Sequence, residues 1–401
     1  MIRVVKTKFI ANKVNLERLY KCNRVSGEIW NNCLKLSKEY YQKTDKWITK
    51  TELQKCLKKK YNLHSQSVQS VAHKYLNARL GAKHAIEKGY KTRYPYKEKN
   101  NFPTKWAKDG FSINEDGQIK LSMGVWEGKR QKPIYVQVKK LEHMDTVKEI
   151  ELIWDNGLWL AISYDNGKIA IEKSAGKLAA IDMGEIHTIA ATQEFGEAII
   201  ITGRKLRSIK RLRNKKHKEL SKKLARTKKG SRRFHKLKRA KTKVSSKTKA
   251  IQKDILHKTS RQFVNWAIKN DIKKVVVGDV EGVQRNTSTR NKNNPKKKRR
   301  RKIVSQKLSQ WSFGLLLTYL QYKLAEFGIE LIKDTEEYTS QTCPVCNRRK
   351  KVSGRVYKCY CGYSQHRDIH GARNILTKYK YGKICDGGIK ITTVKYLRPA
   401  S

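Results

Sequence analysis

The chain has 401 residues, which is enough for one large domain or for two to three modest ones. It carries 92 Lys and Arg residues against 34 Asp and Glu residues, so its formal net charge is +58, an excess that repels itself unless a polyanion neutralises it. The absence of an apolar span of about 18 residues, of an amphipathic anchor and of an apolar signal core argues against a membrane partner and against export. Because the basic residues are spread along most of the chain, we expect a long nucleic acid as the partner.

The N-terminal part predicts a strand, then helices, then a small antiparallel sheet. Residues 2–8 alternate apolar and basic side chains as a strand does. Helical spacing predicts three helices, over residues 15–42, 50–59 and 65–88. The first would be broken near Ser26 and Gly27. After a loop rich in Tyr, Pro, Asn and Gly, several short strands over residues 110–170, with a hairpin at "DNGLW", predict a sheet or barrel that the first strand completes.

The C-terminal part alternates strands with helices, which indicates an α/β unit of about 200 residues. Three strands are predicted in "KLAAIDMGEIHTIAAT" and "EAIIITGRK", followed by two long basic helices that are separated near Gly230. Further strands are "IKKVVVGDV" and "IELIKDTEE", and "WSFGLLLTYLQYKLAEFG" is a helix with Gly328 as its C-terminal cap. The polar segment "RNTSTRNKNNPKKKRRRK" is expected to be mobile, and the tail from Gly382 carries no clear pattern.

Four of the eight cysteines form two close pairs with the spacing C-x₂-C-x₁₂-C-x-C. They are Cys343, Cys346, Cys359 and Cys361. This spacing suits one tetrahedral Zn²⁺, and four thiolates leave no open position for a catalytic water, so the zinc is expected to be structural. The isolated cysteines are expected to be small buried residues: Cys22, Cys33, Cys56 and Cys385.

Two acids stand out, although each has an ordinary explanation. Asp182 closes the run "KLAAID" and could be a turn residue, while Asp368 begins a predicted helix and could be its N-cap. Together, in a highly basic α/β chain, they suggest a site where carboxylates bind two Mg²⁺ ions about 3.5–4 Å apart to cut phosphodiesters. Three acids from separate segments would be the usual minimum.

Five motifs resemble the TnpB proteins of bacterial insertion sequences, which are related to compact type V CRISPR effectors. The motifs are "IDMG", "VVVGDV", "QKLSQWSFGLLLTYLQYKLAEFGIEL", "EEYTSQTCPVC" and "KCYCGYSQHRDIHGARNIL". The resemblance covers about 200 C-terminal residues in order. It implies an RNA-guided DNA endonuclease that binds an RNA from the element's own end, recognises a short motif beside a double-stranded target and cuts DNA paired to the guide.

The implied fold is an α/β RuvC-like RNase H fold with an inserted zinc ribbon, preceded by a small β-barrel (wedge) domain and a helical recognition domain. The wedge barrel would comprise residues 1–12 and 96–175, with the helical recognition domain at 13–95 between them. The nuclease would comprise residues 176–339 and 364–380 around the zinc ribbon at 340–363, followed by a tail at 381–401. The resemblance also implies two catalytic Mg²⁺ ions beside the structural Zn²⁺.

The chain departs from the commoner family pattern at the second acid. Where that pattern has a glutamate on the central strand, this chain has Gly278, and Asp279 lies one residue further on. Side chains alternate faces along a strand, so Asp279 would point away from the site unless a bulge intervenes. Glu336 and Glu337 lie at the end of the strand "IELIKD", directly before "YTSQTC", the place to which some TnpB-like nucleases have moved their glutamate. The resemblance therefore implies Asp182, Glu336 and Asp368 as the catalytic acids, with Glu337 and Asp279 as reserves for the second acid.

Basic side chains of the first long helix and of the cysteine region are expected to bind nucleic acid. They are Arg204, Lys205, Arg207, Lys210, Arg211, Arg213, Arg348 and Arg349. A charge run is often only a solvated face, but the density here exceeds what solubility needs. Aromatic residues flanked by cations either stack bases or pack in the core, and the core is the default expectation: Tyr40, Tyr41, Tyr94, Tyr96 and Trp106.

Three other functions remain open. The chain could be a nuclease-inactive RNA-guided DNA-binding protein that acts as a repressor, a compact type V CRISPR effector, or a zinc-ribbon RNA-binding protein unrelated to nucleases. Gly278 favours the first, whereas the retained Asp182 and Asp368 argue against it, since acids repel phosphates. The expected location is the bacterial cytoplasm and the expected oligomeric state is a monomer.

Overall fold

The structure is a computed structural model that describes residues 1–139, 146–169, 173, 175–280, 304–352 and 354–399. The chain divides into two compact units, Met1–Lys168 and Ile169–Ser401. The predicted mobile segment "RNTSTRNKNNPKKKRRRK" lies outside the described residues. None of the described helices has the length and apolar character needed to cross a membrane.

The first unit contains three helices between its second and third strands. They are α1 (Lys13–Thr44), α2 (Lys50–Leu57) and α3 (Ser65–Glu87). Side chains at the N-termini explain where the first two begin: Asn12 accepts the backbone N–H of Asn15, and Thr49 forms a capping box with Glu52. All three predicted helices are confirmed.

Helix α1 runs unbroken through Ser26 and Gly27, so the predicted break was wrong. A Cβ at Gly27 would lie 2.6 Å from the backbone oxygen of Lys99, and the hydroxyls of Ser26 and Thr104 are 2.8 Å apart. The two small residues therefore do not end the helix. They allow the chain segment that contains Lys99 and Thr104 to pack closely against it.

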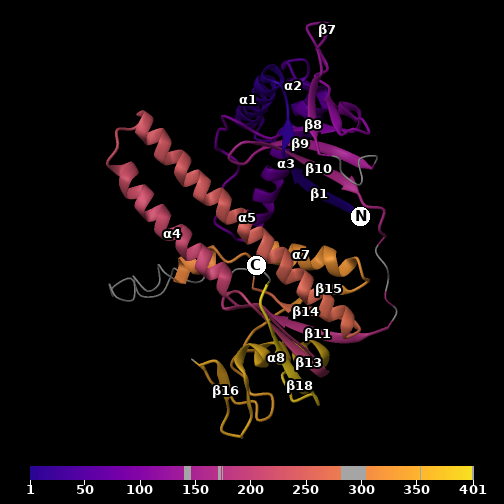
Figure 1. Cartoon of the computed structure of the whole chain (residues 1–401), viewed down its shortest axis with the longest axis vertical. Helices are drawn as coiled ribbons and strands as arrows, with labels where there is room; N and C mark the ends of the chain where they lie inside the picture. Colours follow the sequence, from indigo (N-terminus) through magenta and orange to yellow (C-terminus); the bar gives the residue numbers. More distant parts are fainter. Residues whose placement is uncertain (140–145, 170–172, 174, 281–303, 353, 400–401) are drawn as a thin grey trace. The chain divides into compact units, whose positions relative to one another are not determined.

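Two four-stranded antiparallel sheets complete the first unit (Figure 1). One has the order β1 (Ile2–Thr7), β10 (Leu158–Asp165), β9 (Val147–Trp154), β3 (Thr104–Ala107). The other has the order β2 (Phe9–Ile10), β8 (Ile134–Val138), β5 (Gln118–Leu121), β4 (Phe111–Ile113), and a small hairpin joins β6 (Val125–Trp126) to β7 (Lys129–Arg130). Both edge strands of the first sheet continue into edge strands of the second, β1 into β2 and β3 through the short 3₁₀ turn Lys108–Gly110 into β4, which gives a barrel-like body.

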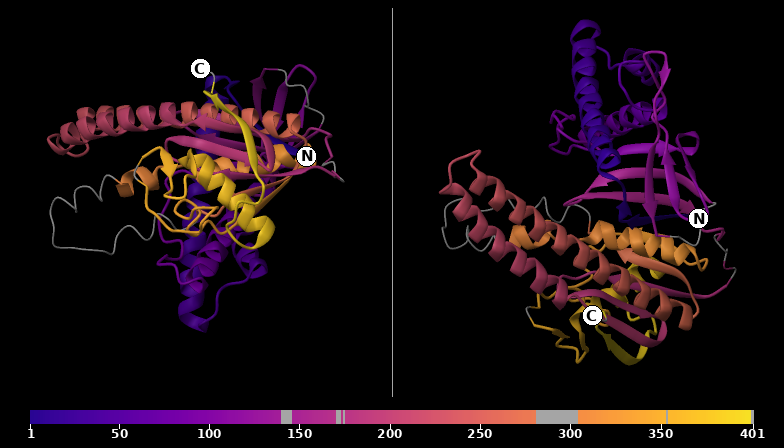
Figure 2. Two further views of the ribbon diagram at one scale, coloured as in Figure 1. Left: turned by 90° about the horizontal axis from the view of Figure 1, so that it is seen from below. Right: turned by 45° about the horizontal axis from the view of Figure 1, so that its top comes forward.

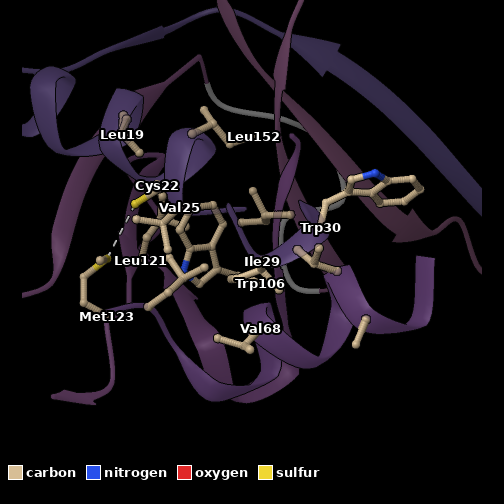
Figure 3. Close-up of a cluster of buried hydrophobic side chains, with 14 of the residues drawn as sticks. Leu19, Cys22, Val25, Ile29, Trp30, Val68, Trp106, Leu121, Met123 and Leu152 are labelled. Carbon is tan, nitrogen blue, oxygen red and sulfur yellow. Dashed lines mark hydrogen bonds between the residues drawn. The ribbon is translucent and has the colours of Figure 1, made fainter. Parts of the chain in front are cut away.

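One apolar core joins the helices and both sheets of this unit. Trp106 lies fully buried at its centre, and Figure 3 shows it among side chains from α1, α3 and the strands. Trp106 is therefore a core residue and not a base-stacking one. Cys22 is buried against Met123, with 3.8 Å between the two sulfur atoms. Cys22 and Cys33 are buried as expected, whereas Cys56 and Cys385 are partly exposed.

The second unit is built on a six-stranded mixed sheet. Its order is β15 (Glu330–Asp334), β14 (Ile272–Gly278), β11 (Lys177–Asp182), β12 (His187–Gln193), β13 (Phe195–Thr202), β18 (Lys390–Leu397). Strands β11, β12 and β13 form an antiparallel meander, while β14 pairs parallel with both β11 and β15, and β18 pairs parallel with β13. Strand β18 lies in the tail for which the sequence offered no pattern.

Helices cover both faces of this sheet (Figure 2). One face packs against α5 (Arg232–Lys269) and α7 (Phe313–Ala325), through side chains such as Ile181 and Val277. The other face packs against α8 (Arg367–Tyr381), through the alternate residues Ala180 and Val276. The fold-class prediction of an α/β unit is thereby confirmed for this part of the chain.

Helix α4 (Arg204–Ala225) packs antiparallel against α5 as a long helical pair, and both figures of the whole chain show the two side by side. The turn between them contains Gly230 at φ 86°, and Ser231 caps α5 by accepting the N–H of Phe234. The predicted pair and its separation near Gly230 are therefore confirmed. Beyond α7, Gly328 adopts φ 69°, the conformation expected of a helix-ending glycine.

Candidate active site and zinc site

Asp182 and Gly278 lie at neighbouring positions at the carboxyl ends of two central parallel strands. Strand β11 ends at Asp182 and β14 ends at Gly278, one position beyond the paired residues Ile181 and Val277. Because side chains alternate between the faces of a sheet, Asp182 and position 278 face the side of the sheet that α8 covers. Asp279 follows the strand and is exposed.

The side chain of Glu336 lies over Gly278. Glu336 comes two residues after the end of β15, the strand beside β14. A Cβ built on Gly278 would lie 3.0 Å from the Cβ of Glu336 and would collide with its carboxylate. Any side chain at 278 would therefore require the Glu336 carboxylate to move aside, whereas glycine leaves this space to it. A carboxylate from β15 thus occupies the position where a side chain from β14 would have been.

Asp368 comes from α8 and completes the group of three acids. It is the second residue of this helix, and the cap is His366, whose side chain accepts the N–H of Asp368, so Asp368 is not the N-cap. The carboxylate of Asp182 rests against Gly371, one helical turn further, where a Cβ would lie 3.1 Å from its Cγ. Gly371 therefore leaves room for Asp182 beside the turn that carries Asp368.

A buried histidine that the sequence interpretation missed holds Asp368. The Nδ1 atom of His187 lies 2.6 Å from Oδ2 of Asp368. An ionised carboxylate can only accept, so Nδ1 is the donor. His366 lies beside this pair, and one side-chain nitrogen or oxygen atom from each of His187, His366 and Asp368 lies within 4.8 Å of the other two. The signal in the sequence was a polar residue beginning the apolar strand "HTIAAT", five residues after Asp182.

The three carboxyl groups differ in acidity. Burial, followed by the charges of Glu336 and Asp368, raises the pKa of Asp182 to about 8. Burial and then the charge of Asp279 raise the pKa of Glu336 to about 7. Burial alone would also raise the pKa of Asp368, but the hydrogen bond and charge of His187 outweigh it and lower that pKa. Without a cation, neutral pH therefore does not favour full ionisation of all three acids.

This donor set fits hard divalent cations. It consists of carboxylate oxygens, which Mg²⁺ prefers. Burial, and after it the neighbouring carboxylates, raise the pKa values of Asp182 and Glu336, and a cation bound between them would favour their ionised forms. The reserve acids lie close by: the charge of Asp279 reaches Glu336, and Glu337 is exposed next to it.

The four paired cysteines converge as a tetrahedral metal site requires. Their sulfur atoms all lie within 4.8 Å of one another, with Cys343 and Cys361 3.5 Å apart and Cys346 and Cys359 3.4 Å apart. Sulfur atoms on a tetrahedral zinc would be separated by roughly 3.8 Å, given a Zn–S bond of about 2.3 Å. Asn347 and Gly362 adopt positive φ angles, 57° and 87°, where the chain turns around each pair. The four thiols therefore fit one Zn²⁺ ion.

The segment that carries these cysteines, hereafter the ribbon (residues 340–366), packs directly on α8. It contains the hairpin β16 (Val356–Lys358) and β17 (Ser364–His366). The ring of Tyr357 stacks on His370 of α8 with centroids 3.9 Å apart. Asn374 of α8 donates to the backbone oxygens of Thr339 and Thr342, both at 2.8 Å. The helix that carries Asp368 in its first turn is thus the surface on which the ribbon packs.

The predicted nucleic-acid-binding residues fall into three groups. Four of them line one cavity of the second unit, namely Arg204, Arg207, Lys210 and Arg211. Lys205 is exposed outside the cavity lining, and Arg213 is half-buried. On the ribbon, Arg348 and Arg349 are exposed, and the guanidinium of Arg349 lies over the ring of Tyr338 at 4.0 Å.

Two protein-family descriptions match the second half of the chain. The family described as "Probable transposase" matches residues 161–284, and the family described as "Cas12f1-like, TNB domain" matches residues 313–375. The second match contains the four paired cysteines, Glu336 and Asp368, and the first contains Asp182.

Curated relatives agree with these matches. The TnpB-like protein MJ0751 of Methanocaldococcus jannaschii is 27% identical over 217 residues, which cover 53% of this chain and 72% of that protein. The CRISPR-associated endodeoxyribonuclease Cas12f1 of Sulfoacidibacillus thermotolerans is 30% identical over 123 residues, 30% of this chain and 25% of that protein. The chain thus matches only about a quarter of the length of this Cas12f1 protein.

Solved structures share the fold. A Cas12f1–sgRNA–target DNA complex aligns with a TM-score of 0.65 at 16% identity, covering 91% of this chain and 83% of that one. The mini-RNA-guided endonuclease CRISPR-Cas phi3 aligns with a TM-score of 0.52 at 11% identity, covering 97% and 92%. The predicted resemblance to TnpB proteins and to compact CRISPR effectors is confirmed.

Proposed function

We propose that this chain, which resembles TnpB and Cas12f1 proteins, is an RNA-guided DNA endonuclease that hydrolyses phosphodiesters with Asp182, Glu336 and Asp368. Its curated relatives include proteins named as endodeoxyribonucleases, which supports nuclease activity. The single observation that carries the proposal is the Glu336 carboxylate over Gly278, because it supplies a third acid where the commoner pattern of the family has its strand-borne glutamate. In this proposal the two parts of a RuvC-like nuclease enclose the ribbon, and a guide RNA and a double-stranded target are the partners.

The three acids would bind and space two Mg²⁺ ions. Asp182 is the central member, because the charges of both other acids reach it. His187 donates to Oδ2 of Asp368 and so fixes the orientation of that carboxylate. When bound, the cations would make water a better nucleophile and stabilise the departing 3′ oxygen. Binding them would also release the protons that Asp182 and Glu336 hold near neutral pH.

The rest of the chain would hold the nucleic acids. Basic side chains on α4 and on the ribbon are the proposed backbone contacts, since a protein that holds a guide duplex reads its shape and phosphates while base pairing reads the sequence. The zinc would fix the ribbon and do no chemistry. Such an enzyme acts where its DNA target lies, which in a bacterium is the cytoplasm.

The decisive experiment compares two neighbouring glutamates. The full chain is purified with its co-expressed RNA and offered a matched double-stranded target with Mg²⁺. Glu336→Gln should slow cutting by about a hundredfold or more, because a lost metal ligand removes several kcal/mol of transition-state stabilisation. Glu337→Gln, which changes an exposed neighbour, is the matched control and should cut normally.

Binding is measured in the same samples by gel shift. Both variants should bind RNA and target as the native chain does. Target binding without cutting in the native chain would instead identify an inactive RNA-guided repressor. Cutting that survives Glu336→Gln but is lost in Asp279→Asn would move the second acid to Asp279.

A further inference from the structure

A basic cavity of about 930 Å³ lies in the second unit, beside the turn that follows Asp182. Its wall is the N-terminal half of α4, and its other side is the segment 306–316, which leads into α7. Glu185 and Thr188, three and six residues after Asp182, form its edge. The cavity is large enough for part of a polynucleotide chain, since ligand pockets of proteins span about 300–1,000 Å³.

The wall of this cavity is strongly cationic. Seven basic residues line the cavity: Arg204, Arg207, Lys210, Arg211, Lys215, Lys218 and Lys307. Glu185 is the one acid among the lining residues, and its carboxylate pairs with Arg207 at 3.3 Å. An anionic ligand with several charges suits this wall, whereas a neutral or cationic one does not.

The floor of the cavity is apolar and contains an aromatic ring. Leu206, Leu256, Phe313 and Leu316 are buried beneath it, and Trp311 is only half-buried at its lining. Aromatic rings below a cationic rim are how proteins hold unpaired nucleotides, with the base stacked and the phosphates paired. A paired base in a duplex has no free face to offer such a floor.

Hydrogen bonds hold the Trp311 segment to the long helices. The side-chain amides of Gln310 and Asn214 bond each other twice, at 3.1 and 3.2 Å. On the other side of Trp311, the Ser312 hydroxyl accepts from Gln252 of α5 and from Lys210 of α4. Trp311 is therefore fixed between two anchored neighbours, and the cavity is formed before any ligand arrives.

We propose that this cavity binds an unpaired nucleotide of a DNA strand, with its base on Trp311 and its phosphates on Arg204 and Arg211. The ligand chemistry, a base flanked by phosphates, is shared by RNA. We assign DNA because the cavity adjoins the turn after Asp182, at the end of the sheet that also carries the proposed acids. The cavity lies on the α5 and α7 face and the carboxylates lie on the α8 face, so a strand held here would pass over this end of the sheet to reach them. This choice rests on the proposed function; the binding of an unpaired nucleotide does not.

The first test measures the affinity of the full chain, purified with its RNA, for single-stranded oligo(dT), without any cutting. Trp311→Leu should weaken binding by about five- to a hundredfold, the range that one base–aromatic stack contributes. The salt dependence should stay unchanged, whereas Arg204→Gln with Arg211→Gln should reduce it, because only phosphate contacts release counterions. Phe195→Leu, at another exposed aromatic ring of the same unit, is the control and should bind normally.

An abasic oligonucleotide separates stacking from charge. It retains the phosphates, so the native chain should bind it weakly and Trp311→Leu should weaken it no further. Equal losses on both oligonucleotides would overturn the proposal. An oligo(U) strand bound tenfold more tightly than oligo(dT) would assign the cavity to RNA and overturn the choice of DNA.

The second test uses the native protein, so it does not depend on a variant folding. Oligo(dT) carrying one 5-iodouracil is cross-linked by light, and the attached peptide is identified by mass spectrometry. Attachment at Trp311 or Phe313 supports the proposal, and attachment only elsewhere contradicts it. Because neither test needs hydrolysis, failure of the nuclease proposal would leave both results readable.

Discussion

Gly278 matters for the space that it leaves to another residue. A glycine in place of a catalytic glutamate suggests an inactive enzyme when only the strand is considered. In the folded chain the carboxylate of Glu336 lies over this glycine, and a Cβ there would lie 3.0 Å from the Cβ of Glu336. The effect of the glycine at 278 therefore depends on Glu336, and the two positions have to be considered together.

This dependence predicts the outcome of a swap. Gly278→Glu should abolish cutting by colliding with Glu336, and Glu336→Gly should abolish it by removing the acid. The double variant returns a carboxylate to the central strand and should recover at least tenfold in rate over either single variant, measured as cleavage of a matched target. Gly314→Ala is the control, because a Cβ there meets no atom of the described residues within 4 Å. A double variant no faster than the worse single one would contradict the shared space.

A pH dependence of stability follows from Asp182. Its pKa is 3.8 as a free side chain and about 8 in the folded chain, so the fold binds this proton more tightly than the unfolded chain does. The stability contributed is full below pH 4 and is lost as the pH rises toward 8. Without metal, Asp182→Asn should therefore raise the melting temperature at pH 8 by about 2–4 °C, the shift that roughly 1 kcal/mol produces in a domain of this size.

The same comparison at pH 5 should give a smaller difference, and added Mg²⁺ should stabilise the native chain at pH 8 but not the variant. Both are measured by differential scanning calorimetry. Asp254→Asn is the control, since Asp254 pairs with Lys258 on the surface of α5. An equal difference at pH 5 and pH 8 would contradict the raised pKa.

At the level of single residues, the sequence offered reasons to propose the acids but none for their surroundings. Asp182, Glu336 and Asp368 were proposed from strand ends, a helix start and a family resemblance, and the structure brings the three side chains together. His187 was not proposed, because a histidine at the start of an apolar strand has no partner until the fold brings α8 beside it. The place of Trp311 in the cavity could not be predicted from the sequence either, because it depends on how segment 306–316 lies against α4.

At the scale of elements, the ribbon and α8 form one assembly. Tyr357 stacks on His370, and Asn374 bonds the backbone of the chain entering the ribbon. The same helix carries Asp368 at its start and Gly371 against Asp182. The ribbon therefore packs on the helix that presents one of the three proposed acids.

Loss of zinc should consequently affect the proposed acid site from a distance. Cys346→Ser with Cys359→Ser should release zinc, raise amide hydrogen exchange by orders of magnitude over residues 340–366, and loosen the first turn of α8, because structural zinc contributes folding energy directly. Cutting should fall with it. Exchange in β11 and β14 should stay slow, since their core packs independently of the ribbon.

The control for this experiment is Cys385→Ser, which changes a cysteine outside the metal cluster and should retain zinc and activity. Zinc content is measured by mass spectrometry and exchange by peptide mapping. Unchanged amide exchange over residues 367–371 in the zinc-free protein would show that the ribbon does not stabilise the helix turn that carries Asp368, and would contradict the prediction.

Most helices and strands were predictable because their patterns are local. The long basic pair, the Gly230 turn and the "DNGLW" hairpin follow from spacing and from residues that favour turns. Strand β18 was not predictable, because its burial does not alternate and the strand is defined by pairing with β13, nearly two hundred residues earlier. The predicted helix break at Ser26 and Gly27 was wrong for the same reason, because these residues contact the distant segment around Lys99 and Thr104.

At the scale of the whole molecule, the prediction of function rested on the net charge and on the order of the sequence motifs. The net charge of +58 indicated a polyanionic partner, and the ordered C-terminal motifs indicated the family. The fold match at 16% identity covers 91% of the chain, including the first unit, where the sequence has no sharp motif. The fold is thus shared with a protein of low sequence identity. The proposed acid site, in contrast, can be recognised in the sequence only at the few positions that form it.

The two segments that flank the ribbon each carry one proposed acid. Glu336 comes seven residues before Cys343, and Asp368 comes seven residues after Cys361. Glu336 directly follows β15, and Asp368 is held by α8, which packs on the central strands, so both flanks are anchored to the sheet. Residues added to or removed from the middle of the ribbon should therefore leave the spacing of the three carboxylates unchanged.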